Sequence, residues 1–179
     1  MLLPEYDVIG FDYSSQTPWD AAREFPPFFD DVAGQHSDVS ILGNSIGAFF
    51  AMTALCDKQI KNALLISPLV DMEGLILSFM AASGVSEEAL RREREITTDF
   101  GETLSWKYLE HVRRHPLRWT VTTHILYGGN DGLTSRDTIT AFAERIGATL
   151  TILEDGEHWF HTPEQLAFLD HWLQKHLQE

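Results

Sequence analysis

The stretch of sequence that decides the fold is Asp38-Val39-Ser40-Ile41-Leu42-Gly43-Asn44-Ser45-Ile46-Gly47, an apolar run that leads directly into a G-x-S-x-G pattern. Short apolar runs of this kind are typical of buried strands, and residues 48–55 are apolar nearly all round, as in a buried helix. A sharp strand-to-helix turn holds the serine of such a pattern in a strained conformation and exposes its hydroxyl. The two flanking glycines permit this turn because they have no side chain to collide with the strand or the helix. We therefore interpret Ser45 as a nucleophile, with the Ile46 N–H at the helix start aimed at a developing oxyanion.

The rest of the chain alternates between short apolar runs and helical patterns. The runs predict strands at 6–12, 38–42, 62–69, 122–127 and 149–153. The patterns predict helices at 19–24, 28–33, 48–55, 135–146 and 162–177, with Pro26-Pro27 expected to break the first two apart. Continuous rather than alternating apolar strands belong to parallel sheets that are covered on both faces. The sequence therefore predicts an α/β fold with a mostly parallel sheet flanked by helices.

Residues 70–116 interrupt this alternation. They contain three helical patterns, at 72–82, 86–95 and 102–115, and no recognisable strand pattern. Both ends of the insertion would meet the carboxyl edge of the sheet, where the loop of Ser45 also lies. We therefore expect one domain over residues 1–179 with a helical cap inserted at about 70–116, and we expect the cap to be a mobile lid over Ser45.

Composition excludes several other classes of protein. The 179 residues are 44% hydrophobic, which is ordinary for a globular chain, and the formal net charge of −14 disfavours binding to nucleic acid or to anionic membrane surfaces. The single cysteine, Cys56, permits no intramolecular disulfide, and no signal peptide or long apolar span is recognisable. These features predict a cytoplasmic protein whose partner is a small molecule.

A serine nucleophile needs a base, and eight histidines are available. His158 lies in the loop between the last strand and the last helix, which opens at the same sheet edge as Ser45. His161 is in the same loop and is the main alternative. His124 lies within a strand, and His176 is expected on the surface of the last helix. We interpret His158 as the general base.

The third member must be a carboxylate that orients the histidine and stabilises its charged form. Asp131 follows the strand ending at Tyr127, in a loop that also reaches the carboxyl edge, and it precedes His158 in the chain. Asp71, which follows the third strand, is the alternative, while Asp155 and Glu157 are interpreted as ordinary polar loop residues. The chain order serine, aspartate, histidine favours Asp131 as the acid.

These motifs together resemble the α/β-hydrolase superfamily. Residues 43–47 resemble its nucleophile turn, Tyr127-Gly128-Gly129-Asn130-Asp131 its acid loop, and Gly156-Glu157-His158 its base loop. The resemblance is nearly continuous from Tyr6 onward. It implies a helical cap over the site and hydrolysis of an ester-like bond through an acyl-serine, without a metal or an organic cofactor.

One departure concerns the start of the chain. Residues 6–12 resemble the strand that, in this superfamily, follows the loop supplying a second oxyanion donor. The resemblance therefore lacks both this loop and the earlier strands. The loop 12–16 is a candidate substitute. If nothing replaces the missing donor, we expect the chain to be a weak catalyst. We also expect its incomplete sheet edge to make it prone to form homo-oligomers. A longer version of the chain would then be the competent enzyme.

The substrate class follows from the cap and from the neighbours of the triad. The apolar stripe of the first cap helix could line an acyl pocket, although packing of the cap explains it equally well. The alternatives to a carboxylic-ester hydrolase are a carbon–carbon bond or amide hydrolase on the same triad, and a non-catalytic binding protein. The expected substrate-contacting residues are Asn44, Leu75, Phe79, Met80 and Trp159.

Overall fold

The computed structural model describes residues 6–177 of the chain. These residues form two compact units. One consists of the described residues up to Leu69 together with those from Arg118 onward, and the other is Val70–Leu117. Each unit is described by itself below.

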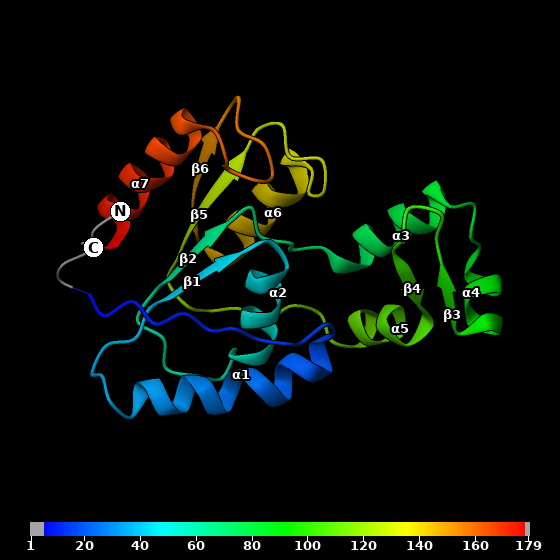
Figure 1. The fold of residues 1–179 in the computed structure, drawn as a ribbon, viewed down its shortest axis with the longest axis horizontal. Helices are drawn as coiled ribbons and strands as arrows, with labels where there is room; N and C mark the ends of the chain where they lie inside the picture. Colours follow the sequence, from blue (N-terminus) through cyan, green and yellow to red (C-terminus); the bar gives the residue numbers. More distant parts are fainter. Residues whose placement is uncertain (1–5, 178–179) are drawn as a thin grey trace. The chain divides into compact units, whose positions relative to one another are not determined.

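The first unit contains a four-stranded sheet in which every pairing is parallel (Figure 1). Its strands are β1 (Ile41–Asn44), β2 (Ala63–Ile66), β5 (Thr123–Gly128) and β6 (Thr149–Leu153), in the spatial order β1-β2-β5-β6. β2 and β5 are buried along their whole length, as their continuous apolar sequences require. The predicted fold class, a parallel sheet with helices around it, is confirmed.

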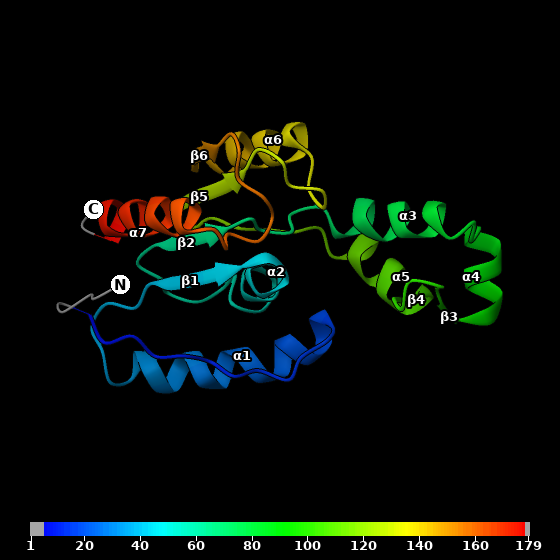
Figure 2. The same ribbon diagram turned by 45° about the horizontal axis from the view of Figure 1, so that its top comes forward.

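Helices cover both faces of this sheet. They are α1 (Pro18–Ala33), α2 (Ser45–Ala54), α6 (Arg136–Ile146) and α7 (Pro163–Leu177). Trp172 and Leu173 of α7 pack on one face, in a core cluster with Leu64 and Leu126. Side chains alternate along a strand, so Leu65 and Ile125 point to the other face. Both are fully buried, and α2 and α6 lie on that side (Figure 2).

Helix α1 corrects the expected break at Pro26-Pro27, because it runs unbroken through both prolines. Thr17 caps its start by accepting the Asp20 N–H, and Pro18 occupies the first turn, where a missing N–H costs nothing. Its buried face includes Phe25 and Phe29, which pack towards α2. Burial of this aromatic face outweighs the loss of backbone hydrogen bonds at the two prolines.

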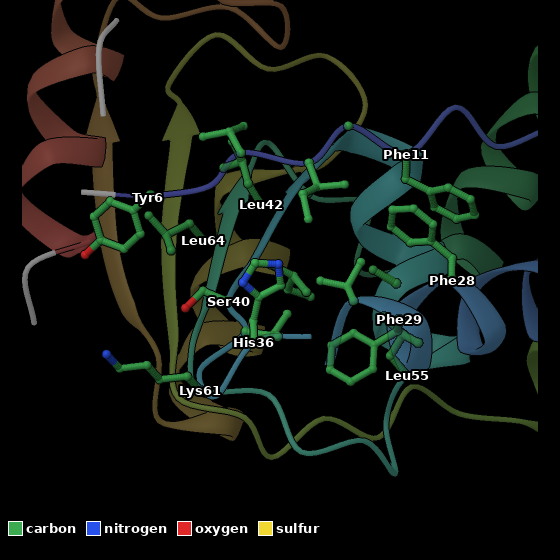
Figure 3. A pocket seen from close by; sticks show the side chains of 18 of the residues that line it. Tyr6, Phe11, Phe28, Phe29, His36, Ser40, Leu42, Leu55, Lys61 and Leu64 are labelled. Carbon is green, nitrogen blue, oxygen red and sulfur yellow. The ribbon is translucent and has the colours of Figure 1, made fainter. Parts of the chain in front are cut away.

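Residues 6–12 form no strand, so the expected pairing beside β1 is wrong. They run extended without ladder partners, and β1 is an edge strand of the sheet. A pocket of about 810 Å³ lies along β1, lined by residues 6–11, by Phe28 and Phe29 of α1, and by Leu42 and Leu64 of the sheet (Figure 3). Leu42 is 57% exposed there. An extended segment becomes a strand only when a neighbour completes its hydrogen bonds, and here the pocket separates the segment from β1.

The second unit contains three helices and a hairpin. Its elements are α3 (Met72–Ala82), α4 (Glu87–Glu93), β3 (Glu95–Thr97), β4 (Thr103–Ser105) and α5 (Trp106–Arg114). Arg113 joins the helices, since its guanidinium donates to Glu73 at 2.7 Å and to both carboxylate oxygens of Glu87 at 2.6 and 2.8 Å. The Arg113 guanidinium also lowers the pKa of the Glu87 carboxyl.

The antiparallel pair β3–β4 corrects the expectation that this segment holds no strand. The β-branched run Ile96-Thr97-Thr98 favours extended backbone, and Gly101 supplies the turn with φ at +92°. The third predicted helix consequently begins at Trp106 instead of residue 102. Among the described helices of both units, none has the length and apolar character needed to cross a membrane.

Candidate active site

The sheet register brings three loops to one edge. Asn44 at the end of β1 pairs with Ile66, and Gly128 near the end of β5 pairs with Leu153 at the end of β6. Because parallel strands all end on the same side, the residues that follow them converge there. Ser45 comes directly after β1, and Asp131 and His158 lie in the loops that follow β5 and β6, so residues far apart in the chain meet at this edge.

Ser45 sits in a tight turn between β1 and α2. Its φ is +50°, in the left-handed region that side chains other than glycine rarely adopt. A Cβ placed on Gly43 would lie 2.9 Å from the Ala48 Cα, so only glycine fits at that position. The Leu69 N–H donates to the Ser45 carbonyl at 3.3 Å and holds the turn from the β2 side. These features agree with the turn expected from the G-x-S-x-G pattern.

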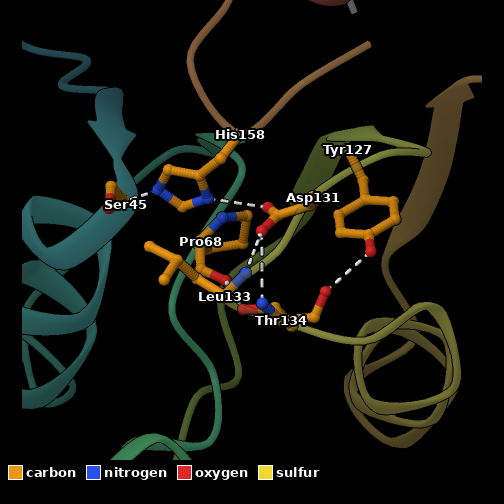
Figure 4. A network of polar contacts seen from close by, with 7 residues as sticks. All are labelled: Ser45, Pro68, Tyr127, Asp131, Leu133, Thr134 and His158. Atoms are coloured by element: carbon orange, nitrogen blue, oxygen red, sulfur yellow. Dashed lines mark hydrogen bonds and ion pairs between the residues drawn. The ribbon is translucent and has the colours of Figure 1, made fainter. Parts of the chain in front are cut away.

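The three side chains form one continuous hydrogen-bonded chain (Figure 4). The Ser45 hydroxyl donates to His158 Nε2 at 2.8 Å, and His158 Nδ1 lies 2.7 Å from Asp131 Oδ2. The Asp131 side chain is fully buried and that of His158 is 19% exposed. A buried carboxylate against one ring nitrogen fixes the other nitrogen as a proton acceptor facing the hydroxyl. The arrangement can therefore remove a proton from Ser45.

The second oxygen of Asp131 is also occupied. Oδ1 accepts the N–H groups of Leu133 at 2.8 Å and Thr134 at 3.2 Å. These two bonds fold the loop back onto its own carboxylate. The carboxylate therefore has partners on both oxygens, which fixes its rotation.

The acid and base loops pack backbone to backbone. The Gly129 N–H donates to the Leu153 carbonyl and the Asn130 N–H donates to the Gly156 carbonyl, both at 2.8 Å. A Cβ on Gly128 would lie 2.4 Å from the Glu157 carbonyl oxygen, and the atoms in the way are backbone. The glycines of the acid loop therefore set how closely His158 approaches Asp131.

We expect Gly128→Ala to destabilise the fold by about 1–3 kcal/mol, because the added methyl forces the two loops apart. Displacement of His158 by about 1 Å would reduce activity by on the order of 10²-fold. Thermal unfolding and esterase assays measure the two effects. Gly132→Ala is the matched control, since nothing lies within 4 Å of a Cβ at that position of the same loop. Equal behaviour of the two variants would contradict the proposed role of loop packing.

The alternative site residues lie elsewhere or have other partners. His161 Nδ1 is 2.8 Å from the Trp159 carbonyl oxygen and 3.5 Å from Glu157, within its own loop. Asp71 accepts the Gly74 N–H at 2.9 Å and caps α3. His176 corrects the expectation of a surface residue, because it is buried and stacks on His124 with ring centroids 4.2 Å apart. The structure thus brings His158 and Asp131, not these residues, to Ser45.

The expected substrate-contacting residues fall into two groups. Asn44 and Trp159 are exposed neighbours of Ser45 and His158 in the first unit, and Trp159 is 66% exposed. Leu75, Phe79 and Met80 lie on α3 of the second unit, where Met80 is buried and Phe79 contacts Phe100 edge-on at 5.8 Å. The role of this second group, like that of the cap as a lid, stays a prediction.

The Ile46 N–H is the expected oxyanion donor. Ile46 lies in the first turn of α2, where backbone N–H groups have no partner within the helix. In the candidate loop 12–16, the Ser14 N–H donates to Glu24 Oε1 at 2.8 Å and the Ser15 hydroxyl donates to Glu24 Oε2. These two donors of the loop are therefore committed to α1.

Three residues that hold the site together could not be recognised from the sequence. Tyr127 and Thr134 lie around Asp131, and buried Gln165 accepts the His161 N–H at 3.0 Å beneath the base loop. A tyrosine in an apolar strand and a glutamine in a helix give no sequence signal of such contacts. Within residues 6–177, the structure shows no cluster of three or more side chains suited to hold a metal ion.

Comparison with known proteins gives structural matches alone. No protein-family model and no curated protein matches the chain. Alpha/beta hydrolase domain-containing protein 10 from mouse is similar with a TM-score of 0.72 and 14% identity, over 93% of this chain and 72% of that one. Est1E from Butyrivibrio proteoclasticus gives 0.67 and 16%, over 92% and 72%. The esterase domain of a Rhodothermus marinus protein gives 0.60 and 14%, over 92% and 72%.

Proposed function

Because the chain has the α/β-hydrolase fold, we propose that it is a serine hydrolase that cleaves a carboxylic ester through an acyl-serine intermediate. The observation that carries the proposal is the hydrogen-bonded chain from Ser45 through His158 to Asp131 at the carboxyl edge of the sheet. A serine hydroxyl needs an adjacent base to become a nucleophile, and the base needs an orienting carboxylate. One structural neighbour, from Rhodothermus marinus, is described as an esterase domain, which agrees with this proposal.

The proposed reaction begins with attack on the ester. Ser45 Oγ bonds to the carbonyl carbon while its proton passes to His158 Nε2, and the carbonyl oxygen becomes negatively charged. The Ile46 N–H at the start of α2 stabilises this oxyanion. The carbon–oxygen bond to the alcohol then breaks, and His158 returns the proton to the departing alcohol oxygen. An acyl-serine remains.

The second half of the reaction uses water in place of the serine hydroxyl. His158 takes a proton from the water molecule while the water oxygen bonds to the acyl carbon. His158 then returns this proton to Ser45 Oγ as the carboxylic acid leaves. Asp131 stays ionised throughout and stabilises the imidazolium each time it forms. These steps need no metal or organic cofactor.

The surroundings of the triad favour an ester with apolar groups. Large apolar side chains stand beside each member of the triad and are partly or largely exposed, namely Ile46, Leu133 and Trp159. Exposed apolar groups gathered at a reactive site are typical of binding surfaces. We propose that Asn44 and Trp159 contact the substrate, and that a small or medium acyl ester is the substrate class.

One observation favours a second candidate, a binding protein without catalysis. Within residues 6–177 we assign one oxyanion donor, the Ile46 N–H, and losing one donor of a pair costs roughly 10²–10³ in rate. A fluorophosphonate probe separates the candidates, because it reacts covalently with an activated serine alone. Labelling of the folded protein together with turnover of a short p-nitrophenyl ester supports the hydrolase. Absence of labelling in a protein shown to be folded would overturn it.

A further inference from the structure

Tyr127 is placed to control the orientation of the acid, although it does not touch Asp131. It is the penultimate residue of β5, and its backbone is in register with Ile152 of β6. Its side chain is 1% exposed. The Tyr127 hydroxyl donates to the Thr134 carbonyl at 2.7 Å, across the loop that carries Asp131 (Figure 4).

Thr134 links this hydroxyl to the carboxylate. It is itself buried, and its N–H donates to Asp131 Oδ1 at 3.2 Å. Its carbonyl and its N–H lie on either side of the same Cα, so a bond to the carbonyl restrains the direction of the N–H. The Thr134 hydroxyl lies 3.5 Å from the Pro68 carbonyl oxygen, at the limit of a hydrogen bond, and contributes less.

The loop is also anchored at its far end. The Ser135 hydroxyl accepts the Thr138 N–H at 3.1 Å and starts α6. Between this anchor and β5, the loop of residues 129–134 has exposed positions at Asn130, Gly132 and Leu133. A loop with this much exposed backbone is free to adopt other conformations unless an interior bond holds it. The Tyr127–Thr134 bond is such a bond, and it ties the loop to β5.

We propose that Tyr127 is a positioning residue, whose hydroxyl holds the Thr134 peptide so that Asp131 stays aligned with His158. The inference rests on the proposed function, because alignment of the acid matters for a catalytic histidine. Burial, and secondly the charge of Asp131, raises the pKa of the Tyr127 hydroxyl. The hydroxyl therefore keeps its proton and remains a donor at neutral and alkaline pH.

Tyr127→Phe tests the proposal, since it removes one oxygen and keeps the ring. We expect kcat to fall about ten-fold with KM nearly unchanged, because a misaligned acid weakens the transition state and not the binding of substrate. Proton NMR is the second measurement. The His158 Nδ1 proton, held between two heavy atoms 2.7 Å apart, should give a low-field resonance that moves or broadens by exchange in the variant.

Thr123→Val is the matched control. Thr123 lies at the opposite end of β5, and its buried hydroxyl donates to the Val121 carbonyl at 2.7 Å, the same length as the bond from Tyr127. This variant should lower Tm but leave kcat, KM and the His158 resonance as they are. A Tyr127→Phe protein that keeps both its kcat and its low-field resonance would overturn the proposal.

The two measurements separate this inference from the proposed function. If the wild-type protein neither hydrolyses esters nor reacts with a fluorophosphonate, the proposed function fails, but the resonance still reports whether Tyr127 aligns Asp131 with His158. If the wild type is active and Tyr127→Phe keeps both its kcat and its low-field resonance, the positioning role fails while the hydrolase assignment stands.

Discussion

Replacement of Ser45 by alanine should reduce hydrolysis of a short p-nitrophenyl ester by on the order of 10⁴–10⁶-fold, the loss expected when a triad nucleophile is removed. The fold should survive, because alanine removes only the hydrogen bond to His158. The close packing around Gly43 is unchanged in the variant. Steady-state rates, fluorophosphonate labelling and a circular-dichroism melt measure activity, serine reactivity and folding separately. An alanine variant that keeps more than about a tenth of the wild-type rate would remove Ser45 from the mechanism.

Ser67→Ala is the matched control for this experiment. Ser67 directly follows the neighbouring strand β2, its φ of +42° is close to the +50° of Ser45, and it is completely buried. Within the described residues its hydroxyl has no hydrogen-bond partner. Removing that hydroxyl should leave both the rate and the labelling at wild-type levels. The comparison isolates the reactive hydroxyl from the strained backbone, which the two serines share.

Replacement of Asp131 by asparagine is expected to have the second largest effect, a fall in kcat of about 10⁴-fold. An amide cannot stabilise the imidazolium by charge, and its NH₂ group would favour the wrong tautomer of His158. The loop should keep its shape, since the asparagine oxygen can still accept the N–H groups of Leu133 and Thr134. Esterase rates and thermal unfolding of the variant measure these two outcomes.

Two aspartates serve as controls for the acid. Asp155→Asn changes an exposed carboxylate near His158 in the base loop, and Asp71→Asn changes the cap of α3, where asparagine also caps well. Both variants should retain wild-type rates. A loss in Asp71→Asn equal to that in Asp131→Asn would show that the acid has been assigned to the wrong residue.

The parallel α/β class and the positions of most strands and helices could be predicted from local pattern. The run before Gly43 and the runs at β2 and β5 are continuous and apolar, and such runs have one stable environment, a sheet covered on both faces. The residues Ser45, Asp131 and His158 were identified because each follows a strand. Parallel strands end at one edge, so sequence position already predicts that the three meet.

Errors arose where distant packing overrides a local signal. Pro26-Pro27 breaks most helices, yet α1 continues because Phe25 and Phe29 are buried on its inner face. Residues 6–12 have the composition of a strand but no neighbour that completes a ladder, and the hairpin of β3 and β4 is too short to show a clear periodicity. For α1 and for residues 6–12, the deciding interaction involves residues outside the window in which periodicity is read.

The sequence by itself determined which serine, carboxylate and histidine meet in the proposed site, because motif, chain order and strand position are all local properties. Tertiary structure alone decided the geometry that makes the chemistry workable. A Cβ on Gly128 would lie 2.4 Å from the Glu157 carbonyl oxygen, so that position excludes a side chain. This contact and the bond from Tyr127 to Thr134 both involve segments that meet once the strands have paired. The reason is physical: hydrogen bonds and close contacts depend on positions to within fractions of an ångström, and a linear pattern specifies the order of residues but not those distances.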